Sequence, residues 1–380
     1  MKVAVGLSGG VDSALSAALL VEQGYEITGV FLECWNEPGC RTDQDRQDAL
    51  AVALKLKIPF RVLDFKRQYR ERVLESFYRE YQAGRTPNPD IWCNREIKFG
   101  LFLEWSLKNG FDYLATGHYA QVMIDSSKIN FRAHTCREWA RGCARKFTLT
   151  SSIKLLQSVD KAKDQTYFLA MLKEKQLRRV LFPIGHLTKK QVRIEAKKRG
   201  LPVWNKKDSS GICFVGHDLN FREFLRRRIK EHEGEAVDKT GKIVGTHQGV
   251  EFYTIGQRYA RPLFVIQKDI LRNRLIVGTK ADLARREFEV EGWSRIRGIK
   301  PVKEFRGFEG IHPQVMGKSQ HTLKVRIRHQ GRLISCKIEG KKVKLAKPEF
   351  GIAPGQLAVI YAPTRFNLEG LECLGGGVIR

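Results

Sequence analysis

Two cysteines and an aspartate are the residues whose types and surroundings most favour chemistry. Asp90 stands three residues before Cys93, in a segment punctuated by Pro87 and Pro89. A helix is expected from Glu96 to Leu107, and its N-terminal end would favour a thiolate just ahead of it. Cys213 lies far along the chain in the polar stretch from Asp208 to Phe214. Only the fold can bring the two thiols together, and the alternative is that each is a small buried core residue.

A glycine-rich loop, Ser8 to Ser13, is a second chemical feature. It lies between an expected strand, Val3 to Gly6, and an expected helix, Ser13 to Gln23. Such a loop turns free N–H groups and the positive end of a helix toward an anion, which predicts a phosphate site. Asp12 would repel bare phosphate and fits a magnesium contact better. The loop lacks the Gly-Lys-Ser/Thr ending of a P-loop and the Gly-x-Gly-x-x-Gly of a dinucleotide fold. The alternative is a tight turn with Asp12 as helix N-cap.

The elements that must position these residues alternate between strand and helix in the first half of the chain. After the first strand and helix we expect strands at 27–32, 60–64 and 113–116, with helices at 43–56 and 68–82. This alternation predicts an α/β fold with a doubly wound parallel sheet, whose ligand lies beyond the carboxyl ends of the strands.

The second half changes character. A basic helical stretch is expected at 221–231, and short strands follow at 263–267, 274–277, 323–328, 333–338, 357–361 and 373–379. Closely spaced strands favour small β domains, the last a barrel or sandwich. We therefore predict a catalytic domain at 1–216, a central linker domain at 217–283 and a C-terminal β-barrel at 284–380.

Bulk composition limits the partners and the compartment. The 380 residues carry 68 Lys and Arg against 41 Asp and Glu, a formal charge of +27 that favours a polyanionic partner. The alternative is that much of this charge is solvated surface. No long apolar run and no signal-peptide pattern is seen, so we expect a cytoplasmic protein without membrane contact. Eight cysteines in a cytoplasmic chain of this size do not suggest a disulfide framework, and the absence of a Cys-x-x-Cys pair argues against the usual zinc site.

The glycine loop resembles the pyrophosphate loop of the N-type ATP pyrophosphatases, which adenylate a substrate with ATP. Over nearly its whole length the chain also resembles the bacterial tRNA-specific 2-thiouridylases. The shared blocks, in chain order, are 6–13, 88–99, 116–119, 163–169, 182–185, 208–214, 253–258 and 373–377.

The resemblance implies the activity and the roles of single residues. Wobble uridine of tRNA would be adenylated at its 2-carbonyl, with Cys213 carrying a persulfide, Cys93 releasing its sulfur by forming a disulfide with Cys213, and Asp90 as acid/base. The implied ATP contacts are Gly6, Leu7, Ser8, Gly9, Gly10, Val11, Asp12, Ser13, Leu32 and Gly117. The implied tRNA contacts are Asn88, Pro89, Asp90, Lys163, Asp164, Gln165, Arg328 and His329. ATP with Mg²⁺ and persulfide sulfur would be consumed, and a sulfur-carrier protein of a cysteine desulfurase relay would deliver the sulfur.

Plainer interpretations stay open for several of these residues. The Gly117-His118 pair fits an ordinary strand-end turn with a satisfied histidine, and Asp164 fits a helix cap. The strand that carries Arg326, Arg328 and His329 fits a solvated face. Cys336 and Cys373 fit the barrel core, and the basic segment at 128–152, which departs from the family, fits either an extra nucleic-acid contact or an exposed insertion.

Two other functions compete with thiolation. An amide-forming ATP pyrophosphatase would need an ammonia source, and no glutaminase segment is recognisable. A noncatalytic tRNA-binding protein would be expected to have lost the loop or the thiols, yet Ser8, Asp12, Cys93 and Cys213 are all present.

Overall fold

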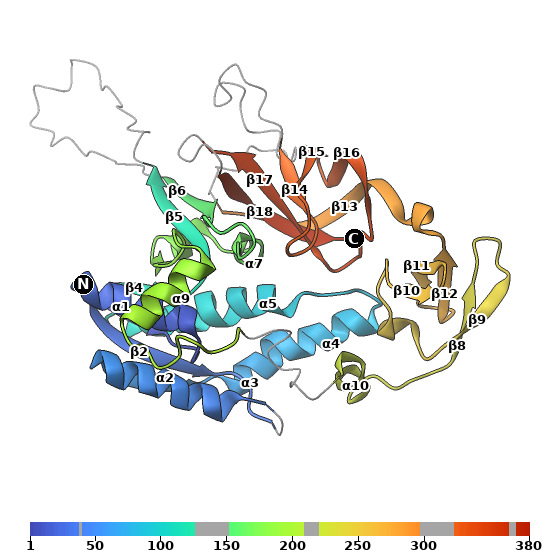
Figure 1. Ribbon diagram of the computed structural model, residues 1–380. Coiled ribbons are helices and arrows are strands. Elements are labelled where there is room, and N and C mark those ends of the chain that lie inside the picture. Colours follow the sequence, from blue (N-terminus) through green and yellow to red (C-terminus); the bar gives the residue numbers. More distant parts are fainter. Residues whose placement is uncertain (38–39, 126–151, 209–219, 297–322, 365–369) are drawn as a thin grey trace, which may run out of the picture.

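The structure is a computed structural model that describes residues 1–37, 40–125, 152–208, 220–296, 323–364 and 370–380. Figure 1 shows three parts: a helix-covered sheet that contains the N-terminus, a β-barrel above it, and a smaller sheet to one side. The barrel contains the C-terminus.

The first sheet is parallel throughout. Within the described residues its strand order is β3-β2-β1-β4-β7. The strands are β1 (Lys2–Gly6), β2 (Glu26–Glu33), β3 (Phe60–Asp64), β4 (Tyr113–Ala115) and β7 (Val180–Leu181). The doubly wound parallel sheet expected from the alternating pattern is confirmed.

Both faces of this sheet are covered, because successive side chains of a strand point to opposite sides. Val3 and Val5 belong to one buried cluster with α1 and α9, whereas Ala4 between them packs with Phe102 and Leu114 on the other face. The helices concerned are α1 (Val11–Glu22), α2 (Thr42–Leu56), α6 (Phe102–Lys108) and α9 (Lys189–Lys198). A strand buried on both faces explains the continuous apolar run of β1.

Two longer helical segments extend from the sheet toward the other domains (Figure 1). The first comprises α3 (Lys66–Tyr69), the π-helical η1 (Arg70–Leu74) and α4 (Glu75–Gln82), which confirms the helix expected at 68–82. The second comprises α5 (Pro89–Trp92), the π-helical η2 (Cys93–Leu101) and α6. Short helices elsewhere are α7 (Thr166–Leu169), α8 (Glu174–Leu177) and α10 (Phe221–Arg226).

The second sheet follows α10. In the described part of the chain its order is β10-β11-β12-β8-β9. Its strands are β8 (Gly234–Val237), β9 (Ile243–His247), β10 (Arg258–Ala260), β11 (Leu263–Asp269) and β12 (Arg274–Gly278), with the 3₁₀ turns η4 (Val250–Phe252) and η5 (Lys280–Leu283). Phe224 and Leu225 of α10 belong to one buried cluster with residues of α4 and with Phe252 of η4.

The third sheet closes into a barrel. Its strands are β13 (Ala284–Arg295), β14 (Lys324–Arg326), β15 (Ile334–Glu339), β16 (Lys342–Phe350), β17 (Leu357–Pro363) and β18 (Leu371–Ile379). Closure comes from β13, which pairs with β16 through its first half and with β18 through its second. The barrel expected at the C-terminus is confirmed. Cys336 is buried in the barrel core as expected, but Cys373 is buried outside that core, in the cluster that contains Tyr167 and Leu169 of α7, so the expectation of a barrel-core Cys373 is wrong.

One hairpin was not expected from the sequence. Strands β5 (Ala120–Asp125) and β6 (Ser152–Gln157) pair with each other, and β6 pairs with β18 of the barrel. A segment of the N-terminal half therefore extends the C-terminal sheet. The domain limits after residues 216 and 283 stay a prediction. Among the described residues, no helix combines the length and apolar character that crossing a bilayer requires.

Candidate active site

The glycine loop lies at the carboxyl end of β1 and leads into α1. Gly9 adopts a positive φ of 72°, and a Cβ there would lie 2.3 Å from the carbonyl oxygen of Asp45, so only glycine fits. The Ser8 N–H donates to Ser13 Oγ at 3.1 Å, and Ser13 Oγ donates to the Gly10 carbonyl at 3.1 Å. Gly10, the N-cap of α1, supplies no side-chain cap, which leaves the first N–H groups of the helix for a ligand. Asp12 lies in the first turn and is not the N-cap.

The backbone at Gly117 lies so close to this loop that a residue with a side chain would not fit there. A Cβ at Gly117 would lie 2.6 Å from Ser13 N and 2.7 Å from the carbonyl carbon of Asp12. Gly117 follows β4, and Leu32 lies near the end of β2, so both share the carboxyl edge of the sheet with the loop. This edge is where parallel sheets bind ligands.

Lysine and tyrosine side chains surround the carboxylate of Asp12. Lys189 Nζ lies 2.8 Å from both of its oxygens, and the Tyr119 hydroxyl donates to Oδ1 at 2.8 Å. Burial and the neighbouring Asp12 charge raise the pKa of Tyr119. Lys189 also lies 2.9 Å from Asp208, so this cation joins two carboxylates from distant parts of the chain.

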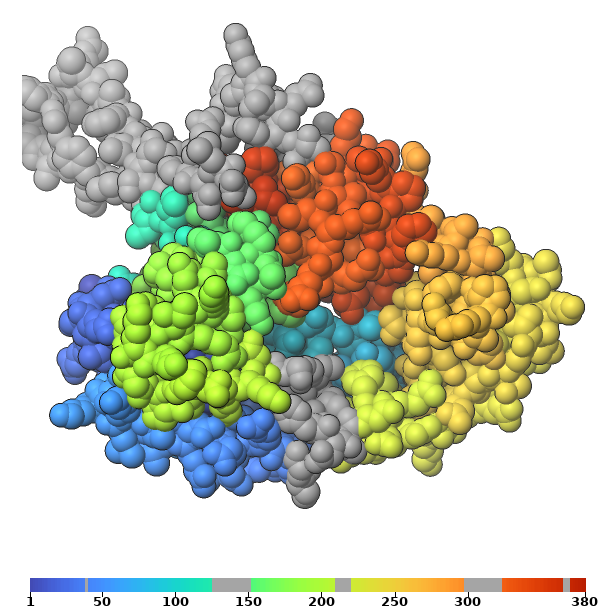
Figure 2. Space-filling view, viewed as in Figure 1, coloured from blue at the N-terminus to red at the C-terminus, as the bar shows by residue number. Residues whose placement is uncertain are grey.

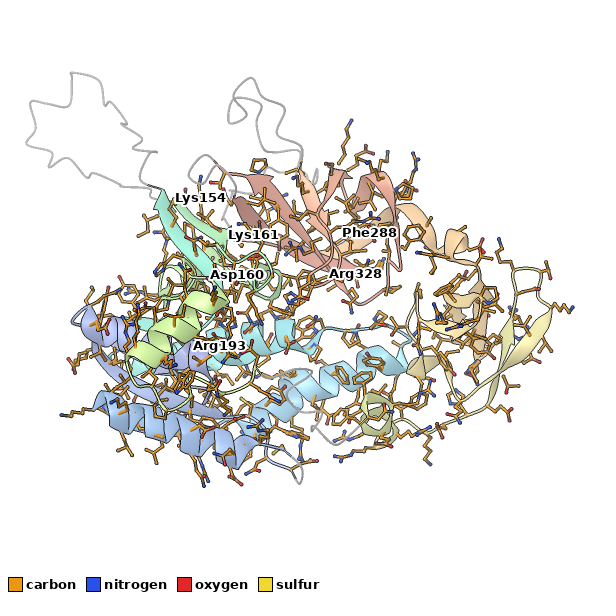
Figure 3. The ribbon with its side chains drawn as sticks, in the orientation of Figure 1. Lys154, Asp160, Lys161, Arg193, Phe288 and Arg328 are labelled. Atoms are coloured by element: carbon orange, nitrogen blue, oxygen red, sulfur yellow. The ribbon has the colours of Figure 1, made fainter. Side chains whose placement is uncertain are left out.

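Asp208 is held by cations from two other segments. Lys163 Nζ lies 2.8 Å from its Oδ2, and Arg193 Nη2 lies 2.7 Å from its Oδ1. Figure 3 shows Arg193 on α9 at this side of the sheet. Burial alone would raise the pKa of Asp208, but hydrogen bonds from Lys163 and Lys189 outweigh it and lower the pKa to about 2.

Asp90 and Cys93 lie on the helix that leads into β4. The helix begins at Pro89, with Asn88 as N-cap accepting from the Asp90 N–H at 3.1 Å. The expectation that Cys93 precedes a helix N-terminus is therefore wrong: the thiol lies a turn inside the helix. The physical reason is that Asn-Pro is itself a strong start signal, an N-cap residue followed by proline at the first helical position.

The two side chains have different surroundings. Burial raises the pKa of Asp90, and the positive charge of Lys98 offsets this effect only in part. Cys93 is 7% exposed and packs in an apolar cluster with Phe77 and Ile97. Figure 2 shows a hollow between the barrel and the N-terminal domain, floored by atoms in the colour of the α4 and α5 region.

A continuous series of hydrogen bonds runs from the loop to the neighbour of Cys93. Asp12 accepts from Tyr119, whose N–H donates to Gln165 Oε1 at 2.9 Å. The Gln165 carbonyl accepts from Phe168 N–H at 3.0 Å, and the Phe168 carbonyl accepts from Asn94 Nδ2 at 3.4 Å. Because a helix joined by a short loop to the following strand runs antiparallel to it, the start of this helix also lies toward the carboxyl edge of the sheet. The glycine loop and the start of the Cys93 helix thus lie toward the same edge of the sheet.

Among the residues implied to touch tRNA, Asp164 lies apart from the surface. Its carboxylate has no exposed area and forms an ion pair of 3.1 Å with Arg326, which is itself buried. It also accepts hydrogen bonds from Ser158 N–H, Gln157 and Thr166. It caps no helix, since α7 has Gln165 as N-cap. Lys163, by contrast, is partly exposed.

Two further implied tRNA contacts, Arg328 and His329, lie in the barrel after β14, and His329 packs against Phe168 of α7. The His329 ring lies 4.2 Å from the Phe168 ring, and burial lowers the pKa of His329. Arg328 is about half exposed. His118 fits the plainer interpretation of a satisfied histidine: it is buried, its Nδ1 lies 2.8 Å from Thr116 Oγ1, and burial lowers its pKa well below the usual value.

Cys213 lies outside the described residues, as does the basic segment at 128–151. Over the part of the chain that the structure covers, no cluster of three or more His, Cys, Asp or Glu side chains is arranged to hold a metal ion. Asp12 can offer one carboxylate to magnesium, provided that Lys189 moves aside.

Sequence reasoning gave no role to Lys189, Asp208 or Lys206. Lys206 Nζ donates to the Gly9 carbonyl at 2.9 Å and to Asp45 at 2.7 Å, so it supports the loop from behind. A signal existed for Lys189, because Thr188 and Gln191 form a capping box that starts α9 just beside it. Its pairing with Asp12 depends on tertiary structure.

Comparison with known proteins agrees with this architecture. Three family models match in order: "tRNA methyl transferase HUP domain" over residues 1–217, "tRNA methyl transferase PRC-barrel domain" over 222–279 and "Aminomethyltransferase beta-barrel domain" over 306–379. These matches, with a glycine-rich loop after the first strand of a parallel sheet and two β domains behind it, place the chain in the HUP-domain class of tRNA-modifying proteins.

Sequence identity to individual proteins identifies the family within this class. The tRNA-specific 2-thiouridylase MnmA of Streptococcus thermophilus (strain ATCC BAA-491 / LMD-9) is 38% identical over 100% of this chain and 95% of its own length. The enzyme of the same name from Streptococcus pyogenes serotype M1 is also 38% identical, with the same coverage. The chain belongs to the tRNA-specific 2-thiouridylase family. A solved tRNA thiolase from Methanococcus maripaludis is 19% identical, covers 60% of this chain and 66% of its own, and has a TM-score of 0.34.

Proposed function

We propose that this chain converts the wobble uridine of tRNA into 2-thiouridine, using ATP to activate the 2-carbonyl and a cysteine persulfide to supply sulfur. The observation that carries the proposal is the hydrogen-bonded series from Asp12 to Asn94, which joins the phosphate loop to the helix of Asp90 and Cys93. A base held between them would reach both. The names of the full-length relatives support the same reaction.

In the first step, the uracil 2-oxygen attacks the α-phosphorus of ATP and pyrophosphate leaves. The uncapped N–H groups of α1 and the hydroxyls of Ser8 and Ser13 would bind the phosphates. Magnesium, carried by ATP, would supply positive charge against the phosphates, with Asp12 as one ligand. Lys189 lies beside Asp12 with 13% of its side chain exposed and would turn toward phosphate when nucleotide enters.

Asp90 fits the proton transfer of this step. Attack by the 2-oxygen requires the N3 proton of uracil to leave, and a carboxylate can accept it. Burial raises the pKa of Asp90, which makes its carboxylate a stronger base than an exposed aspartate.

In the second step, the Cys93 thiolate attacks the inner sulfur of a persulfide on Cys213. The bond to the outer sulfur breaks, hydrosulfide leaves, and a disulfide forms between the two cysteines. Hydrosulfide then attacks C2 of the activated uracil, and AMP leaves with the former carbonyl oxygen. The disulfide must be reduced by an external thiol before the next round. Because Cys93 is buried among apolar side chains, the thiol must become accessible for this step.

Two partners follow from this chemistry. Transfer RNA is the substrate, and a sulfur-carrier protein would load Cys213. Since ATP, tRNA and thiol reductants meet in the cytoplasm, we place the activity there.

A pair of measurements on Cys213→Ser tests the order of steps. The variant should release pyrophosphate in a tRNA-dependent reaction like the wild type, yet form no 2-thiouridine, because adenylation needs no thiol. Cys336→Ser, a buried barrel cysteine, is the matched control and should thiolate normally when folded. Normal thiolation by Cys213→Ser would overturn the persulfide assignment. The family description also speaks of methyl transfer, and incorporation of a labelled methyl group instead of sulfur would overturn the proposed function itself.

A further inference from the structure

The turn between β14 and β15 forms one wall of a groove on the barrel. Figure 3 shows Arg328 at the edge of the barrel that faces the helices of the N-terminal domain. The groove has a volume of about 600 Å³. Its lining residues are Lys280, Arg328, His329, Gln330, Gly331, Arg332, Glu349 and Phe350.

A buried carboxylate holds two of these arginines from behind. Glu349 has 2% of its side chain exposed and accepts from Arg328 Nη2 at 3.0 Å and from Arg332 Nε at 2.6 Å. Arg328 Nη1 also donates to the Phe350 carbonyl at 3.0 Å. Each guanidinium is therefore fixed on its inner side, which limits the orientations of its outer side.

The outer sides of the two guanidiniums remain accessible. About half of the Arg328 side chain and 61% of the Arg332 side chain are exposed. Within the described residues, the two terminal nitrogens of Arg332 have no hydrogen-bond partner. With the exposed ammonium of Lys280, which lies 5.6 Å from the Phe350 ring, the groove carries three cations against one buried anion. Rigid, paired guanidinium groups suit the oxygens of phosphate.

Two contacts place the groove beside the candidate active site. Gln330 Nε2 donates to the Ala162 carbonyl at 3.1 Å, next to Lys163. The neighbouring His329 lies against Phe168, whose carbonyl accepts from Asn94. A polyanion bound over Lys163 and the Cys93 helix would therefore extend along the groove, which favours RNA over a separate acidic protein.

We propose that Glu349 is a positioning residue that fixes Arg328 and Arg332, together with Lys280, as a clamp for the ribose-phosphate backbone of the bound tRNA. This inference rests on the proposed function, which supplies the tRNA, and extends the expected contact at Arg328 to three residues without an earlier role. The clamp contacts phosphates, so it contributes affinity and alignment independent of base sequence.

The decisive test uses the sign of a charge change. Glu349→Gln removes a negative charge, so simple electrostatics predicts tighter binding of an unmodified tRNA transcript. Loss of positioning predicts the opposite, and we expect the dissociation constant to rise about tenfold. Affinity equal to or tighter than that of the wild type, in a folded variant, would overturn the proposal.

Two variants of the exposed Arg332 test the same proposal if Glu349→Gln does not fold. Arg332→Ala should weaken tRNA binding and lower the slope of log affinity against log salt by about 0.7–0.9, the value for one phosphate contact. Arg332→Lys keeps the charge but loses the fork geometry and should behave more like Arg332→Ala than like wild type. Lys337→Ala, an exposed cation on β15 outside the groove, is the matched control and should leave both quantities unchanged.

The outcomes separate this inference from the proposed function, because tRNA binding is measured without ATP or sulfur. Wild-type affinity and salt slope in both Arg332 variants would overturn the clamp even when the wild-type chain forms 2-thiouridine. A clamp that behaves as expected in a chain that forms no 2-thiouridine would instead refute the proposed function alone.

Discussion

Replacing Asp164 with asparagine should destabilise the fold rather than remove a tRNA contact. The Asp164 carboxylate is enclosed and accepts from Arg326, Ser158 N–H, Gln157 and Thr166. The asparagine amide would leave Arg326 as an uncompensated buried charge and turn donors toward donors. Breaking a buried ion pair from one side costs about 3–5 kcal/mol.

This loss of stability should lower the midpoint of thermal unfolding by a measurable amount. At about 2–4 °C per kcal/mol for a cooperative unit of 150–250 residues, the midpoint of thermal unfolding should fall by roughly 6–20 °C. Circular dichroism or tryptophan fluorescence measures this midpoint, and filter binding measures tRNA affinity below it.

The neighbouring Lys163→Ala is the matched control. Lys163 has 40% of its side chain exposed, and its ion pair with Asp208 lies at the surface. Losing such a pair costs about 0–1 kcal/mol, so this variant should keep its unfolding midpoint while binding tRNA more weakly. If Asp164→Asn kept the wild-type midpoint but lost tRNA affinity, the structural role argued for Asp164 would be refuted.

Three further predictions concern the site. Asp12→Asn should reduce ATP-dependent pyrophosphate release roughly 100-fold while leaving tRNA binding intact, and unchanged turnover would remove the role given to Asp12. Gly117→Ala forces a Cβ to 2.6 Å from Ser13 N, and overpacking of about 1–3 kcal/mol should raise the KM for ATP about tenfold; a normal KM would show that the contact relaxes freely. Because burial raises the pKa of Asp90, its ionised form destabilises the fold above that pKa. Asp90→Asn should therefore melt higher than wild type at neutral pH, with the difference vanishing as pH falls toward the ordinary aspartate pKa of about 3.9, yet form no 2-thiouridine. A lower melting point at every pH would contradict this.

Local patterns were sufficient to predict strands β1 to β4 of the N-terminal sheet, because each is an apolar run specified within a short window of sequence. The two-residue strand β7 is too short to give such a pattern, and the helix expected from Glu96 begins earlier, at Pro89. The barrel was predicted as a class, but β13 and β16 were missed. β13 has only a short alternating stretch, with Phe288 and Val290 between glutamates, and it begins with four exposed residues, so its local signal is weak. Its partner strands also lie far along the chain.

The site was predictable to a different extent. The glycine loop and the Asn88-Pro89 helix start are both local signals, although the apolar pattern alone places the start of this helix at Glu96. The ion pairs of Lys189 with Asp12 and Asp208 join segments that approach only after folding. The spacing of residues along one sequence does not predict these ion pairs. The ion pair between Asp164 and Arg326 likewise forms only in the folded chain. Without it, the sequence does not distinguish a buried structural carboxylate from a surface contact.

Nucleoside mass spectrometry of a tRNA transcript tests the central claim most directly. The transcript is incubated with the chain, ATP, magnesium and a sulfide donor, then digested and compared with a reaction lacking ATP. We expect 2-thiouridine at the wobble position only when ATP is present, with AMP and pyrophosphate formed in equal amounts. Unmodified uridine in the complete reaction, or sulfur incorporation that does not depend on ATP, would contradict it.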